Sequence, residues 1–290
     1  MQRLLNIWRV LPFLTRAVVV GLIVLGFGQL PITVLVAINA MVMPAWPWVI
    51  PIAALYLWGY WQYLDGKGWP RSTSNSRRQS LGSNALTPRL WAWALLAGGS
   101  ATVALRALTD IARVVSPRPG QDLVSAEALA RYPFITVLGL LLLSGITAGI
   151  VEEAALRGYM QRGLERRYGR ARAILVVGVV FALAHYRIGA PDARPWLVFV
   201  PAYLAGAVAW GLLASITDSI IPGIILHSAF DVIGFLRYWQ LGIPHSLWET
   251  GPTRGFWIRC AIVLVFGIAS VPAYIHLSKA ARAAGDRSRA

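Results

Sequence analysis

The stretch PFITVLGLLLLSGITAGIVEEAALRGYM, residues 133–160, joins a long apolar run directly to two adjacent glutamates. A helix crosses the bilayer core with about 20 apolar residues, and this run is long enough to do so. Glu152 and Glu153 end the run, and Arg157 follows them. Charged groups at membrane depth are costly and usually serve a function. The stretch therefore predicts a membrane helix that carries a candidate site.

The rest of the chain has the composition of a membrane protein. Of its 290 residues, 57% are hydrophobic and 13% are charged, about half the charged share of a soluble domain. We expect an all-α, polytopic membrane protein with about eight transmembrane helices and a polar intramembrane cavity. The predicted spans are 17–41, 46–64, 90–109, 133–153, 172–187, 195–215, 219–238 and 256–277.

The net charge of +15 is explained better by membrane topology and lipid contact than by nucleic-acid binding. The basic residues lie in short segments between apolar runs, as the positive-inside rule describes. Eight spans place both termini on one side, and we expect that side to be the cytoplasm of a bacterial-type inner membrane. The segments on that side hold 18 of the 27 lysines and arginines: 1–16, 65–89, 157–172 and 279–290.

Two polar segments divide the chain. Residues 66–88 are basic and rich in Ser, Gly and Pro, which predicts a flexible cytoplasmic loop. Residues 110–132 carry mixed charge and the sequence SPRPG, which indicates an external loop. We expect residues 1–85 to supply N-terminal membrane helices and the basic loop, and residues 86–290 to form the functional core. The single cysteine excludes a disulfide framework within the chain.

The two glutamates are expected to have different roles. Helical neighbours lie about 100° apart, so their side chains face different ways. Glu153 can pair with Arg157 one turn later, and it shares a face with Gly145 and Gly149, whose spacing allows a second helix to approach closely. Glu152 is left free for chemistry. The alternative is a carboxylate pair at the membrane interface, neutralised by the arginines that follow.

Two further polar groups lie in later spans. If the chain turns near Tyr168–Gly169, His185 and Glu152 are equidistant from the turn and lie at matching depth. His227 and Asp231 are four residues apart and share one helical face. Each group has a structural alternative, namely a packed histidine for the first and a pair that only ties helices together for the second. The remaining two histidines, in a loop and at the end of a span, receive no role: His245 and His276.

Three motifs follow one another on successive hydrophobic elements within residues 133–240: Glu-Glu-xxx-Arg (Glu152, Glu153, Arg157), Phe-xxx-His (Phe181, His185) and His-xxx-Asp (His227, Asp231). Together they resemble the CPBP family of CAAX-protease and bacteriocin-processing membrane endopeptidases, also called Abi. The resemblance implies an eight-helix membrane protease with a polar cavity that opens towards the cytosol. The chain departs from many members at Asp231, where they have Asn.

We therefore expect an intramembrane endopeptidase that cleaves near the C-terminus or leader of a membrane-associated peptide or protein, lipidated or membrane-anchored. Peptide hydrolysis needs an activated water and a donor to the developing oxyanion. Glu152 would be the general base, with His185 orienting the water and His227 donating to the oxyanion. The supporting roles fall to Asp231, which orients His227 or donates itself, to Glu153, and to Arg157 and Phe181.

Alternatives remain open on the metal and on the function. His185, His227 and Glu153 are acceptable zinc ligands, with Glu152 acting on the bound water. No HExxH-type spacing occurs, so the sequence does not separate the two mechanisms. We favour metal-free chemistry with no cofactor and keep zinc as the alternative. A non-catalytic membrane scaffold or regulator of the same family is a second function. A proton-coupled transporter is a third, although the chain lacks the repeated halves of many transporters.

Overall fold

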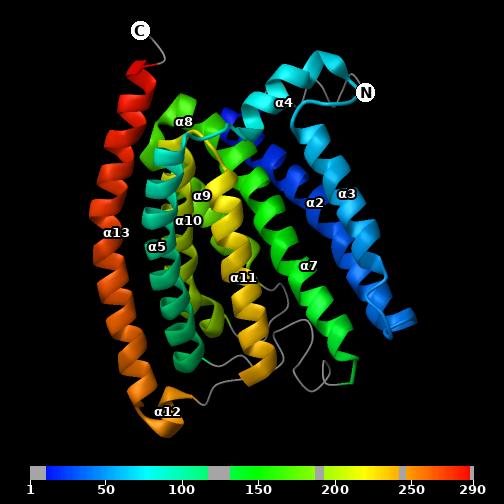
Figure 1. Cartoon of the computed structure of the whole chain (residues 1–290), viewed down its shortest axis with the longest axis vertical. Coiled ribbons are helices and arrows are strands. Elements are labelled where there is room, and N and C mark those ends of the chain that lie inside the picture. The colour runs from blue at the N-terminus through cyan, green and yellow to red at the C-terminus, as the bar shows by residue number, and fades with distance from the viewer. Residues whose placement is uncertain (1–10, 117–130, 187–192, 242–245, 288–290) are drawn as a thin grey trace.

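The computed structural model describes residues 11–116, 131–186, 193–241 and 246–287. In these ranges the chain folds into helices packed side by side, and they contain no β-strand (Figure 1). Each of the eight predicted spans coincides with a long helix. These helices are α2 (Phe13–Val42), α3 (Val49–Leu64), α5 (Pro88–Val115), α7 (Phe134–Glu152), α9 (Arg170–Ala184), α10 (Arg194–Thr217), α11 (Ile221–Leu241) and α13 (Arg254–Arg287).

Five of the described helices are long and apolar enough to cross a membrane: α2, α5, the continuous helix Phe134–Tyr168, α10 and α13. The outward faces of the bundle are apolar as well, since Phe27, Leu55 and Ile268 are 68%, 68% and 70% exposed. A bilayer solvates such surface without cost, whereas water does not. The prediction of an all-α membrane protein is confirmed. The number of eight spans stays a prediction.

The two ends of the described chain lie at the same end of the bundle. Helix α2 begins, and α13 ends, at the end of the bundle that also carries the short helices α4 (Ser74–Leu81) and α8 (Arg162–Tyr168) (Figure 1). The opposite end carries α12 (Leu247–Thr250) and the C-terminal ends of α5 and α11. We call these the terminal end and the α12 end of the bundle.

Helix α7 continues beyond Glu152 as a π-helix, η2 (Glu153–Gln161), and then as α8. The sequence predicted a membrane span over 133–153 and did not predict a π-helix after it. A π-helix has more than four residues per turn because its hydrogen bonds span five residues. Glu153, Arg157 and Gln161 are four apart, so the wider turns keep them in one row, and all three are at most 1% exposed. The π-helix thus directs this row of polar side chains towards the interior of the bundle.

The predicted hairpin between the two motif helices is confirmed. Helix α8 ends at Tyr168, and Gly169 has φ +81°, a conformation that suits glycine. Helix α9 begins directly afterwards at Arg170.

The predicted close approach of a second helix is also confirmed. A Cβ on Gly145 would lie 2.8 Å from the backbone nitrogen of Val232. A Cβ on Gly149 would lie 2.7 Å from that of Ser228. Helix α11 therefore crosses α7 in backbone contact at both glycines, and this crossing sets the position of His227.

The segment 66–88 is not the flexible loop that its composition predicted. It contains a 3₁₀ turn, η1 (Arg71–Thr73), followed by α4. Arg77 of α4 lies 4.1 Å from the ring centre of Tyr63, and Leu81 is fully buried. The backbone of Leu81 and its neighbour also packs closely on Gly158 of η2. Its Ser, Gly and Arg content predicted a solvated loop, but these contacts hold the segment against the bundle.

The second polar segment begins later than predicted. Helix α5 continues through residues 110–115 and ends at Val115, where the sequence predicted an external loop from residue 110. The alternation of Arg and Asp with apolar residues keeps the polar side chains on one face of this extension. Residues 117–130, which hold most of the predicted loop, lie outside the described residues.

Candidate active site

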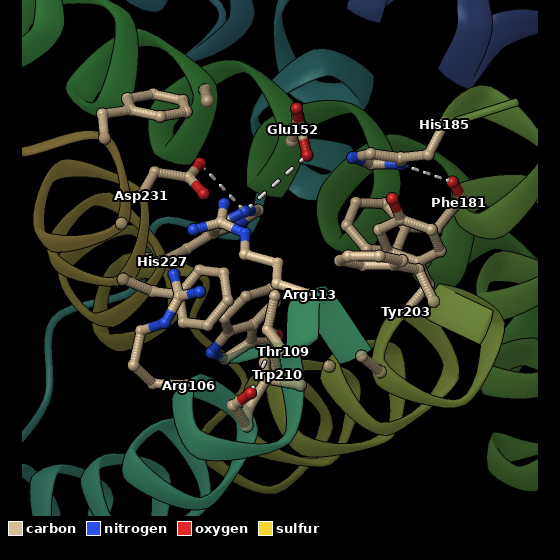
Figure 2. Close-up of a pocket in the computed structure, with 18 of the residues that line it drawn as sticks. Arg106, Thr109, Arg113, Glu152, Phe181, His185, Tyr203, Trp210, His227 and Asp231 are labelled. Carbon is tan, nitrogen blue, oxygen red and sulfur yellow. Dashed lines mark hydrogen bonds and ion pairs between the residues drawn. The ribbon is translucent and has the colours of Figure 1, made fainter. Parts of the chain in front are cut away.

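A cavity of about 350 Å³ lies between five helices and gathers most of the predicted site residues (Figure 2). Its polar lining includes Glu152, His185, His227 and Asp231. Each comes from a different motif except the last two, which share α11. The cavity wall also contains residues that the sequence did not indicate: Arg106, Thr109, Arg113, Tyr203 and Trp210.

His227 lies at the centre of the polar cluster and is 3% exposed. Its Nδ1 is 2.9 Å from Oε1 of Glu153. A carboxylate only accepts, so Nδ1 carries a proton and donates it to Glu153. Its Nε2 faces two carboxylates, 3.7 Å from Oε2 of Glu152 and 3.5 Å from Oδ2 of Asp231. Glu153 therefore holds the ring through Nδ1, and Nε2 is directed towards the cavity.

Glu153 lies behind His227 and does not line the cavity. Its side chain is fully buried, and Oε1 also lies 3.2 Å from Nη1 of Arg157, as the four-residue spacing predicted. The Arg157 guanidinium, equally buried, is packed near two aromatic rings, 5.2 Å from the centre of Phe181 and 5.5 Å from that of Trp210. This buried ion pair lies behind His227, and its Glu153 carboxylate holds the imidazole in place.

Glu152 faces the cavity, as its helical position predicted. Its side chain is 18% exposed, and Oε2 has no hydrogen-bond partner among the described residues. The 3.7 Å separation from His227 is longer than a hydrogen bond. Oε2 itself is buried and is directed at His227, and a carboxylate oxygen without a hydrogen-bond partner is available to accept a proton.

His185 lies in the same cavity as Glu152 but does not bond to it directly in the described part of the chain. It follows the last residue of α9, and its Nδ1 is 2.8 Å from the carbonyl oxygen of Phe181, to which it donates. Its ring stacks on Tyr203 with the centres 4.4 Å apart. Because Nδ1 is used, Nε2 is the nitrogen left for a substrate or a water (Figure 2).

Two aromatic residues on α10 hold the histidines, and the sequence reasoning missed both. Trp210 is 1% exposed and stacks on His227, with the ring centres 4.0 Å apart. Tyr203 stacks on His185 in the same way. The two residues are seven positions apart, so they lie on one face of α10 two turns from each other. That spacing of aromatic residues in the span 195–215 was the available signal.

The cavity extends towards the α12 end of the bundle. Arg113 lies in the last turn of α5 and Tyr238 in the last turn of α11, and both line it. At the inner end it is closed by Trp210 and by the buried pair behind His227. The outer end of the cavity therefore lies at the opposite end of the bundle from the start of α2 and the end of α13, whereas we expected the termini and the cavity opening on one side. Which end faces the cytoplasm stays a prediction.

The residues suggested as zinc ligands are not gathered around one point. Glu153 contacts Nδ1 of His227 directly and is turned away from the cavity that His185 lines. Across the described ranges, no three His, Cys, Asp or Glu side chains form a group that could hold a metal ion. His276 stacks on Trp93 with ring centres 4.9 Å apart, and His245 lies outside the described residues.

A family model supports the resemblance read from the motifs. Residues 134–233 match the model described as type II CAAX prenyl endopeptidase Rce1-like. The match covers about a third of the chain and includes all three motifs. It is consistent with the CPBP family of CAAX proteases. Neither a curated protein nor a solved structure matches the chain at a significant level.

Proposed function

We propose that this chain is an intramembrane endopeptidase that hydrolyses a peptide bond near the C-terminus of a membrane-associated protein. One observation carries the proposal most directly. His227 is fixed by Glu153 at 2.9 Å and presents Nε2 to the cavity next to the unpartnered Oε2 of Glu152. A base and a hydrogen-bond donor thus face the same space, which is the arrangement that hydrolysis of a carbonyl requires.

Glu152 activates the water. Its carboxylate accepts a proton from a water molecule in the cavity while the water oxygen attacks the carbonyl carbon of the substrate. Glu152 then returns the proton to the nitrogen of the leaving peptide as the C–N bond breaks. His185 lies in the same cavity with Nε2 free and orients the water. This assignment follows the geometry of a general base within reach of its proton.

His227 stabilises the oxyanion. When both ring nitrogens carry protons, Nδ1 donates to Glu153 and Nε2 donates to the oxygen on which negative charge develops. Asp231, 3.5 Å from Nε2, keeps the ring turned towards this position. The Trp210 ring, stacked on the imidazole, restricts its tilt. The asparagine of many family members would orient the ring through a hydrogen bond in place of a charge.

The proposed reaction uses no metal ion. Glu152 supplies the general base, His185 orients the water, and His227 donates a hydrogen bond to the oxyanion. We expect purified enzyme to keep its activity after treatment with a strong zinc chelator. Inactivation by the chelator and recovery with added zinc would assign the activity to the metal-dependent alternative.

The family suggests a lipidated substrate. The matching model is described as a CAAX prenyl endopeptidase. CAAX proteins carry their prenyl group on a cysteine four residues from the C-terminus. We propose a lipid-modified or membrane-anchored C-terminus as the substrate class, in the inner membrane of a bacterial-type cell. The apolar outer faces of the helices are compatible with a substrate that reaches the cavity from the bilayer.

Replacement of Glu152 tests the reaction. We expect Glu152→Gln to lower kcat by about 10²- to 10⁴-fold, because the amide cannot accept the proton of the water. The assay is cleavage of a fluorogenic, S-farnesylated peptide by detergent-purified protein. Thermal unfolding should be unchanged, because Glu152 makes no hydrogen bond through Oε2. A fully active Glu152→Gln protein would remove this residue from the mechanism.

A further inference from the structure

Two arginines of α5 line the cavity, and only one of them is neutralised. Nη2 of Arg106 lies 2.8 Å from Oδ1 of Asp110, one turn along the same helix. Asp110 also lies 3.1 Å from Arg237 through its other oxygen. Arg113 forms no ion pair within the described residues. Its guanidinium lies 5.9 Å from the ring centre of Tyr238, and its charge also acts on the more distant carboxylate of Asp231. A cation without a carboxylate at membrane depth is costly and is by default a candidate functional group.

The charges of the cavity are separated along its length. The inner end carries the carboxylates of Glu152 and Asp231 around His227. The outer end carries Arg113, in the last turn of α5. Arg106 lies two turns deeper on the same helix, against Phe230 and Gly234, and its partner Asp110 lines a neighbouring pocket. Figure 2 shows the Arg113 side chain reaching into the pocket on the side of His227 and Asp231. A peptide that lies along the cavity therefore meets a base at one end and an unpaired cation at the other.

We propose that Arg113 binds the free C-terminal carboxylate of the substrate and so places the scissile bond at Glu152. This inference rests on the proposed peptidase function and specifies its substrate: a chain with a free carboxylate only a few residues beyond the cleaved bond. A guanidinium binds a carboxylate through two parallel hydrogen bonds, which fixes both distance and orientation. The cavity volume of about 350 Å³ limits the part of the substrate beyond the bond to a few residues.

The separation of charge also sets the direction of the bound peptide. A C-terminal carboxylate at the inner end would lie against Glu152 and Asp231, which repel it. The same carboxylate at the outer end replaces the missing partner of Arg113. The cavity thus favours a C-terminal tail over an internal segment of a long chain, which has no carboxylate at this distance from the bond.

The test compares two forms of one peptide. An S-farnesylated, fluorescent peptide with the modified cysteine four residues from its end is made with a free carboxylate and with a carboxamide. Its affinity is measured on purified Glu152→Gln protein, with and without Arg113→Ala, and its cleavage is measured on the corresponding proteins with Glu152 intact. Arg89→Ala is the matched control, because Arg89 is exposed on the first turn of the same helix, at the terminal end.

We expect the carboxylate peptide to bind about 10- to 100-fold more tightly than the carboxamide, and Arg113→Ala to remove this preference. Arg113→Lys should retain part of it, and Arg89→Ala should leave it unchanged. Equal binding of both peptides to the protein with Arg113 intact would overturn the inference, as would an equal loss for both peptides in Arg113→Ala. The cleavage assay tests the proposed peptidase function separately. If the binding preference is present but no Glu152-dependent cleavage occurs, only the proposed reaction is contradicted.

Discussion

Adjacent residues at the end of one membrane helix have opposite environments. Glu152 faces a cavity with an unpartnered oxygen, whereas Glu153 is fully buried between His227 and Arg157. The one-residue step along the helix turns one carboxylate towards the substrate and the other towards the core. The difference predicts that the same isosteric change has a catalytic effect at one position and a structural effect at the next.

We expect Glu153→Gln to lower the free energy of unfolding by about 3–5 kcal/mol, because it leaves Arg157 as an uncompensated buried charge. Arg157 is 0% exposed and has no other carboxylate within ion-pair distance in the described ranges. Activity should fall as well, since His227 loses the acceptor of its Nδ1 proton. Thermal unfolding in detergent measures the first effect, and peptide cleavage measures the second.

Glu152→Gln is the matched control for this experiment, since it makes the same chemical change one position earlier. We expect it to abolish cleavage without lowering the unfolding temperature. If both variants are destabilised equally, the buried pair does not stabilise the fold in the way proposed here.

The sequence predicted the contacts between ionisable residues on the same helix, because the helical period is known. Glu153 pairs with Arg157 at the expected spacing, and His227 and Asp231 share a face. It did not predict that Glu153 bonds to His227, because this contact depends on where α11 crosses α7. Trp210 was missed for the same reason. A tryptophan in an apolar span is indistinguishable from a packing residue until its stacking partner, here His227, is known.

At the scale of the helices, the crossing of α7 and α11 positions the site. The absence of side chains at Gly145 and Gly149 lets the α11 backbone approach, and His227 then lies beside the two glutamates. Sequence spacing predicted that a second helix would approach at the two glycines, without identifying it, and predicted the hairpin at Gly169. It did not predict the π-helix η2 or the packing of α4, because both follow from contacts with other helices and not from local composition.

We expect Gly149→Ala to separate these two helices. The added Cβ would lie 2.7 Å from the backbone nitrogen of Ser228, so the backbone of α11 has to move. Overpacking of this kind costs about 1–3 kcal/mol, and the separation of His227 from Glu152 should grow, which lowers cleavage. Unfolding temperature and kcat should therefore fall together.

Gly99→Ala provides the control for added helix propensity. Gly99 lies within α5, and a Cβ there would meet nothing within 4 Å. This change should leave activity intact and stabilise the protein by up to about 1 kcal/mol. Equal activity of both variants would show that the glycine contact does not control the site.

At the scale of the whole molecule, the basic segments and the cavity lie at opposite ends of the bundle. The terminal end holds α4 and α8 and most of the arginines. The cavity extends to the α12 end, past Arg113 and Tyr238. From the positive-inside rule we expect the terminal end to lie in the cytoplasm. We therefore expect the cavity to face the outer side of the membrane, in contrast to the cytosolic cavity that the family resemblance implied.

Cysteine labelling in intact cells tests this orientation. The single Cys260 is first replaced by serine, and one cysteine is then placed at Ser76 in α4 or at Thr250 in α12, both exposed. We expect a membrane-impermeant maleimide to label Thr250→Cys in intact cells and Ser76→Cys only after permeabilisation. The reverse pattern would place the cavity in the cytoplasm and require the basic segments to lie outside, against their charge. Such a result would favour a cytosolic lipidated substrate, whereas the expected pattern restricts the substrate to proteins whose C-terminus crosses the membrane.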